Sequence, residues 1–152
     1  MSVFESAKHL SGAKPGPSTI VSVCATCRVA SSSGAPRLGE VMLAALAPVL
    51  RDQVPDVVVR TVQCLGVCKR PATIAISARH GYTFVFGDLD PQSGPLAIAT
   101  FVKSYRDADY GFVPWAARPE VLRTRLVARI PSVLWSPPDG RPPPHEASEY
   151  IL

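Results

Sequence analysis

The sequence has little charge and no hydrophobic run long enough to cross a membrane. Of its 152 residues, 18% are charged and 47% are hydrophobic, a balance that supports a packed core and argues against wholesale disorder. The longest apolar run, residues 41–50, is interrupted by Pro48, whereas a membrane-spanning helix needs about 20 residues. Residues 1–10 contain no apolar stretch of signal-peptide length. We therefore expect a cytoplasmic protein with no membrane segment.

Sequence motifs for several common activities are also missing. There is no P-loop, no dinucleotide-binding glycine fingerprint and no Ser/His/Asp set. The formal net charge is +4, but the arginines are scattered and form no long basic run, so nucleic-acid binding has no motif behind it. A mildly basic face for an acidic protein partner is equally consistent with this charge.

Proline and glycine divide the chain into three parts. The sequence has 16 prolines and 10 glycines, and they gather toward the two ends. Residues 1–18 are predicted to be a flexible leader, and residues 132–152 a proline-rich extended tail. Between them, residues 19–131 are predicted to form one thioredoxin-like, ferredoxin-type metal-binding domain.

Hydrophobic spacing in this domain predicts an α/β fold with four strands and two to three helices. Pro48 is expected to end or bend the last turn of the first helix. The first strand–helix–strand is a natural right-handed crossover and predicts a parallel pair, while the next two strands predict an antiparallel hairpin. This is the connectivity of a thioredoxin-like fold with a four-stranded mixed sheet. The predicted strands cover residues 19–23, 57–62, 73–76 and 82–86, and the predicted helices begin at 38, cover 94–106 and run from 118 to about 129.

The four cysteines come in two pairs, and each pair follows a predicted strand. Because neighbouring parallel strands end on the same side of a sheet, Cys24 and Cys27 are expected to meet Cys64 and Cys68. Two thiolates separated by two or three residues can bind one metal ion if the backbone between them turns sharply, as Gly66 allows. Four thiolates are the number that zinc or a [2Fe–2S] cluster requires, and disulfides are uncommon in a reducing cytoplasm.

Two other interpretations of the cysteines are open. Cys24 and Cys27 occupy the position where a thioredoxin-like disulfide oxidoreductase keeps its reactive pair. In those enzymes the pair opens a helix, whereas here a loop rich in serine and glycine intervenes, and Cys64 and Cys68 are left without a role. Alternatively, the cysteines are small buried hydrophobic residues.

The second pair carries a resemblance to a known group of proteins. The stretch Cys64-Leu-Gly-Val-Cys68, followed by Lys-Arg-Pro71 and the strand at 73–76, resembles the second ligand loop of thioredoxin-like [2Fe–2S] ferredoxins. That group includes the small cluster-bearing subunit of respiratory complex I and the Shethna-type ferredoxins. The chain is still more similar to a bacterial family of predicted small metal-binding proteins, whose C-terminal region resembles residues 111–115, 118–120 and 129–131.

The resemblance implies a one-electron carrier that is not an enzyme. Cys24 and Cys27 would then hold one iron of a [2Fe–2S] cluster, and Cys64 and Cys68 the other. It also implies a homodimer and a redox partner protein. The first pair departs from the ferredoxins, which space these cysteines more widely, and its tight spacing is also that of a zinc knuckle. A zinc-binding or metal-handling protein with a four-cysteine site is therefore the alternative.

Basic residues flank both cysteine pairs. Arg28, Lys69 and Arg70 would offset the negative charge of a four-thiolate site and face an acidic redox partner. The competing interpretation is that they are ordinary solvated loop charges.

Overall fold

The structure is a computed structural model that describes residues 19–27 and 34–132. The predicted leader, Arg28 and all but the first residue of the predicted tail lie outside the described residues. None of the described helices is long and apolar enough to cross a membrane. In chain order the elements are β1 (Ile20–Cys24), α1 (Leu38–Gln53), β2 (Val58–Val62), β3 (Ile74–Ser77), β4 (Thr83–Phe86), α2 (Gly94–Asp107), two short 3-10 turns (Asp109–Gly111 and Trp115–Ala117), α3 (Glu120–Arg123) and β5 (Leu126–Ile130).

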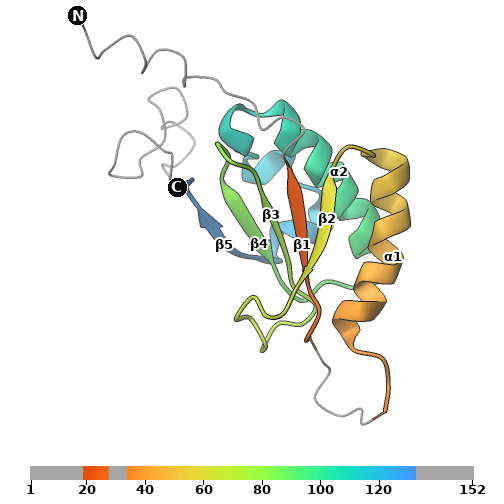
Figure 1. Cartoon of the computed structure of the whole chain (residues 1–152). Coiled ribbons are helices and arrows are strands. Elements are labelled where there is room, and N and C mark those ends of the chain that lie inside the picture. Colours follow the sequence, from red (N-terminus) through yellow and green to blue (C-terminus); the bar gives the residue numbers. More distant parts are fainter. Residues whose placement is uncertain (1–18, 28–33, 133–152) are drawn as a thin grey trace, which may run out of the picture.

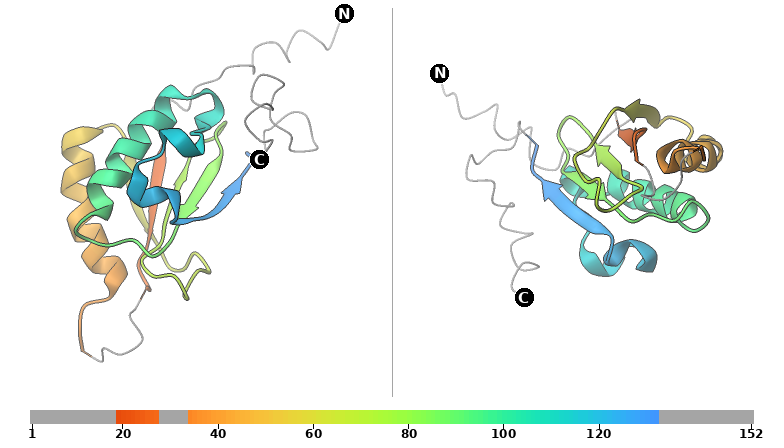
Figure 2. Two further views of the ribbon diagram at one scale, coloured as in Figure 1. Left: turned by 180° about the vertical axis from the view of Figure 1, so that it is seen from behind. Right: turned by 90° about the horizontal axis from the view of Figure 1, so that it is seen from below.

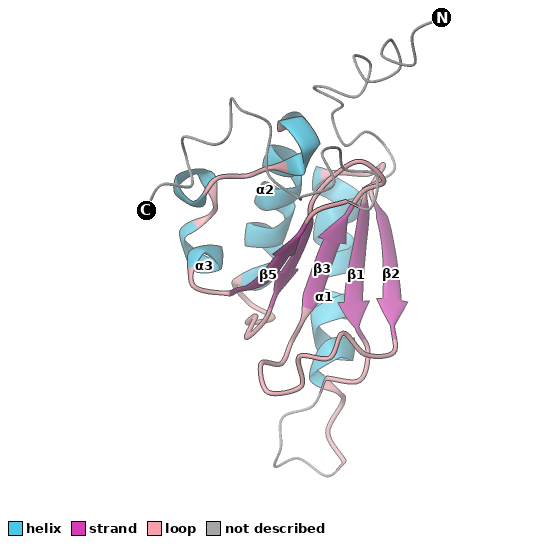
Figure 3. Cartoon of the chain, turned by 90° about the vertical axis from the view of Figure 1, so that its left-hand side faces the viewer, coloured by secondary structure: helices cyan, strands magenta, loops and turns pink. Residues whose placement is uncertain are grey.

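The described strands form one mixed sheet in the order β2-β1-β3-β4-β5, which Figure 1 shows from the side. β1 and β2 run parallel, with Cys24 opposite Val62, and the other neighbouring pairs are antiparallel. Helices α1 and α2 pack on the same face of the sheet (Figures 2 and 3). The predicted thioredoxin-like α/β fold, with its parallel crossover and its antiparallel hairpin, is confirmed.

The sheet has a fifth strand that was not predicted. A helix was expected from residue 118 to about 129, but only Glu120–Arg123 are α-helical there, and Leu126–Ile130 pair with β4. The strand was missed because Arg129 faces the core. Its guanidinium lies 4.6 Å from the ring centroid of Phe112 and 5.2 Å from that of Tyr82. A charged residue on the core side breaks the apolar alternation by which a strand is recognised.

The first helix also continues further than expected. α1 runs to Gln53 with Pro48 inside it, although a proline there removes one helical hydrogen bond. The buried residues Met42, Leu46 and Leu50 lie on one side of the helix, before and after the proline. Burial of this apolar stripe against the sheet outweighs the lost hydrogen bond.

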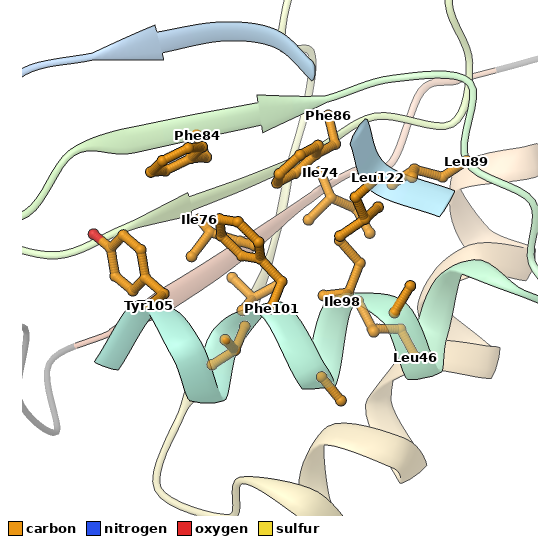
Figure 4. Packing of buried hydrophobic residues seen from close by; sticks show 14 of the residues in the cluster. Leu46, Ile74, Ile76, Phe84, Phe86, Leu89, Ile98, Phe101, Tyr105 and Leu122 are labelled. Atoms are coloured by element: carbon orange, nitrogen blue, oxygen red, sulfur yellow. The ribbon is translucent and has the colours of Figure 1, made fainter. Parts of the chain in front are cut away.

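Alternate residues of the central strands supply the core between the sheet and the helices. Phe84 and Phe86 on β4 are fully buried, and both rings pack edge-on against Phe101 of α2, at centroid distances of 5.0 and 4.9 Å. Figure 4 shows these rings facing the helix across the layer. Tyr105 closes the far end of the layer and donates its hydroxyl proton to the Tyr82 carbonyl at 2.7 Å. The core thus fixes the sheet on which the cysteine loops stand.

Candidate metal centre

The two cysteine loops leave the sheet at the same end, as Figures 1 and 3 show. Cys24 is the last residue of β1, and its N–H donates to the Thr73 carbonyl at 3.0 Å. The next residue, Ala25, donates its N–H to Val62 at the end of β2, at 2.8 Å. The first loop is therefore bound to both neighbouring strand ends. The predicted meeting of the two loops follows from the parallel pairing of β1 with β2.

The first cysteine pair is buried. Cys24 is 3% exposed and Cys27 is 5% exposed, and each thiol shifts the pKa of the other. Between them, the Thr26 hydroxyl lies 3.6 Å from the Cys24 sulfur and donates to the carbonyl of Gln63, the residue before Cys64. The backbone of Leu65, inside the second loop, helps to lower the pKa of Cys24. The two loops therefore contact each other directly.

The second pair is exposed and already has the spacing of two ligands on one metal ion. The sulfurs of Cys64 and Cys68 lie 3.9 Å apart. Metal–sulfur bonds of about 2.3 Å at tetrahedral angles place two thiolates about 3.8 Å apart. Gly66 has a φ of +75° and donates its N–H to the Cys64 sulfur at 3.2 Å. The sharp turn expected of this glycine is present.

The thiols differ in acidity. Burial disfavours the thiolate of Cys24, but hydrogen bonds from Thr26, Leu65 and Cys27 lower its pKa overall. Burial, followed by the hydrogen bond with Cys24, raises the pKa of Cys27. The hydrogen bond and charge of Cys64 raise the pKa of Cys68, and the charge of Cys24 adds to this. The charge of Cys24 therefore acts on Cys68 in the other pair.

The cysteines converge in pairs rather than on a single point. In the described part of the chain, no three His, Cys, Asp or Glu side chains surround one metal position. A single tetrahedral zinc ion needs all four sulfurs around one point, whereas a [2Fe–2S] cluster needs two cysteines on each of two irons. The four sulfurs are the donor set that either centre uses, and the structure brings them together as two pairs.

The charged residues near the site have separate roles. Lys69 is exposed beside Cys68. Arg70 is engaged elsewhere, because its Nε bonds Asp88 at 2.7 Å and its guanidinium also reaches the Thr124 carbonyl at 3.3 Å. This ion pair ties the second loop to the turn after β4. Of the three basic residues predicted to flank the cysteines, Lys69 is the exposed cation that the structure describes.

Sequence reasoning missed two residues that shape this end of the sheet. Thr73 is 1% exposed and its hydroxyl lies 3.9 Å from the Cys27 sulfur. Gly39, in the first turn of α1, packs so tightly on the first loop that a Cβ there would overlap the Cys24 carbonyl oxygen. A glycine at the second position of a predicted helix was the visible signal for that close approach.

Fold and site together define a thioredoxin-like α/β protein with two cysteine pairs at one end of its sheet. The chain belongs to the family described as "Protein of unknown function (DUF1636)", whose model matches residues 21–132. No curated protein matches the chain.

One solved structure shows the same fold, and a second is a weaker match. A thioredoxin-like [2Fe–2S] ferredoxin from Aquifex aeolicus aligns with a TM-score of 0.50 and 13% identity, covering 77% of this chain and 97% of its own. A 1.5 Å crystal structure of the wild-type thioredoxin-like [2Fe–2S] ferredoxin from the same organism aligns with a TM-score of 0.46 and 11% identity, covering 72% of this chain and 96% of its own. At these identities the likeness extends to the fold alone.

Proposed function

We propose that this chain is a ferredoxin-like one-electron carrier with a [2Fe–2S] cluster. Cys24 and Cys27 would hold one iron, and Cys64 and Cys68 the other. The observation that carries the proposal is the arrangement of the thiols as two close pairs on two touching loops. A bound cluster takes up and releases single electrons without making or breaking bonds in a substrate.

Pairing favours the cluster over the alternative of a four-cysteine zinc site. In the Cys64–Cys68 pair the sulfur–sulfur distance already suits one tetrahedral metal. The described residues bring no third ligand to that position. One zinc ion would need all four sulfurs around a single point, whereas each iron of a [2Fe–2S] cluster needs only the two sulfurs of one pair.

Burial argues against a thiol–disulfide enzyme, although the lowered pKa of Cys24 is a feature of such enzymes. A reactive thiol must be reached by a substrate disulfide, and both Cys24 and Cys27 are almost fully buried. In the first turn of α1, Gly39 donates its N–H to the Cys27 carbonyl, at 3.3 Å, and not to a sulfur. This enzyme would again leave the exposed pair without a role.

The two cysteine loops would have different roles: the first would shield sulfur ligands, and the second would meet the redox partner. Cys24 and Cys27 are almost fully buried, so their sulfurs would be kept from water and oxidants. The second loop, with Cys64, Cys68 and Lys69 exposed, is where a partner protein would exchange the electron. An acidic surface on that partner would complement Lys69 and speed the encounter.

Serine substitution of single cysteines tests the ligand set. We expect Cys64→Ser to lose most of its iron and to lose the visible absorption that bleaches on reduction. A matched control is Ala25→Ser, which adds a hydroxyl to the first loop without removing a sulfur and should keep both. A Cys64→Ser protein that keeps full iron and its absorption would contradict the four-cysteine site.

A further inference from the structure

Thr73 joins the two cysteine loops although it belongs to neither pair. It lies five residues after Cys68 and directly before β3. Its carbonyl accepts the Cys24 N–H at 3.0 Å, and its hydroxyl accepts a hydrogen bond from the Cys27 thiol at 3.9 Å. One buried side chain from the segment after the second loop thus contacts the first pair.

The Thr73 hydroxyl has two neighbours and a single proton. It donates that proton to the Arg70 carbonyl at 3.1 Å, and it accepts from the Cys27 thiol, whose sulfur lies 3.9 Å away. A hydroxyl can accept and donate at once, so both contacts are satisfied while Cys27 carries its own proton.

A metal ligand has no thiol proton to donate, because a coordinating cysteine is deprotonated. The Cys27 sulfur would then be an acceptor only, and it would compete with the Arg70 carbonyl for the hydroxyl proton. A hydrogen bond to a charged acceptor is about twice as strong as one to a neutral acceptor. The Arg70 carbonyl would not be left unpaired, since the Asp88 N–H also donates to it at 3.0 Å. The network therefore allows the hydroxyl to turn at little cost.

We propose that Thr73 is a positioning residue for the metal centre, whose hydroxyl turns from the Arg70 carbonyl to the Cys27 sulfur when that sulfur binds metal. This inference rests on the proposed function only in taking Cys27 as a metal ligand. Hydrogen bonds to ligand sulfurs stabilise negative charge on the centre. Thr73 accordingly strengthens metal binding and favours the reduced state of a cluster.

Two substitutions at this position separate the hydroxyl from the shape of the side chain. Thr73→Val keeps the branched shape without a donor, and Thr73→Ser keeps the donor. Thr61→Val, on the exposed strand β2, controls for the substitution itself. Melting of the metal-free proteins checks that each variant folds. The probe is Zn²⁺ added to the metal-free full chain, with affinity measured by competition against a coloured chelator.

We expect Thr73→Val to weaken Zn²⁺ binding about tenfold, and Thr73→Ser and Thr61→Val to stay within about twofold of wild type. In protein reconstituted with a cluster, Thr73→Val should lower the equilibrium constant for electron uptake about tenfold. For a one-electron couple this corresponds to a reduction potential about 59 mV lower. Equal Zn²⁺ affinity in Thr73→Val, Thr73→Ser and wild type would overturn the inference, as would a wild-type chain that binds no Zn²⁺. A chain that binds Zn²⁺ but assembles no cluster would refute the proposed function, and the Zn²⁺ comparison would still decide the role of Thr73.

Discussion

Replacing Gly39 by alanine tests how closely α1 packs on the first cysteine loop. Inside a helix, alanine is normally favoured over glycine by about 0.5–1 kcal/mol. Here the added Cβ would overlap the Cys24 carbonyl oxygen and approach the Ala25 carbonyl carbon to 3.2 Å. These are backbone atoms, held in place by hydrogen bonds to Thr73 and Val62. They cannot swing aside as the end of a flexible side chain can.

The expected loss of stability follows from these opposing terms. Overpacking costs about 1–3 kcal/mol, and the upper end applies because the obstacle is fixed backbone. After the helix-propensity gain is subtracted, Gly39→Ala should lower the free energy of unfolding by about 2 kcal/mol. With an m-value of about 1.5 kcal/mol/M in urea, the midpoint falls by about 1.3 M.

The assay is urea unfolding of the metal-free full chain, followed by circular dichroism. Gly94→Ala is the matched control, because Gly94 also lies in a first helical turn but its Cβ would meet nothing nearer than the Met42 methyl, at 3.4 Å, and the Leu89 Cβ, at 3.6 Å. That variant should stay within about 0.5 kcal/mol of wild type. If the two alanine variants have the same midpoint, the close packing of α1 on the Cys24 backbone is wrong.

Three further predictions follow from burial, backbone and charge. In metal-free protein, iodoacetamide should label Cys64 and Cys68 before the buried pair, as read by mass spectrometry, and bound metal should protect all four; equally fast labelling of the buried pair would contradict its burial. Gly66→Ala places an L-residue at φ +75°, so we expect about 1–2 kcal/mol of loop strain and a measurably lower Zn²⁺ affinity, and unchanged affinity would refute the role of this turn. The Arg106 hydrogen bond lowers the pKa of Asp56, so the stability it gives is present above the unfolded pKa of about 3.9 and is lost as the pH falls through the lower folded value. Asp56→Asn should therefore lower the melting temperature at pH 7 and match wild type in strong acid, and an equal deficit at both pH values would exclude this ion pair as the cause.

The convergence of the two cysteine loops could be predicted from the sequence because it depends on topology. Two strands joined by a helix pair in parallel, and parallel neighbours end on the same side. The residue after each strand then lies at one end of the sheet, whatever the details of packing. The structure shows Cys24 opposite Val62, two residues before Cys64, in that register.

Features that depend on distant contacts could not be predicted in this way. β5 is a strand because β4 offers it a free edge, and its inward Arg129 is stabilised by rings that lie elsewhere in the chain. Thr73 was predicted only as the start of a strand, since its contact with Cys27 spans 46 residues. Local spacing carries no signal for such contacts.

Metal analysis of the full chain, purified without oxygen, tests the central claim most directly. Iron, acid-labile sulfide and zinc are measured on the same sample and divided by the protein concentration. We predict about two irons and two sulfides per chain, with almost no zinc. A colourless protein that carries one zinc per chain and no sulfide would contradict the assignment of the four cysteines to an electron-transfer cluster.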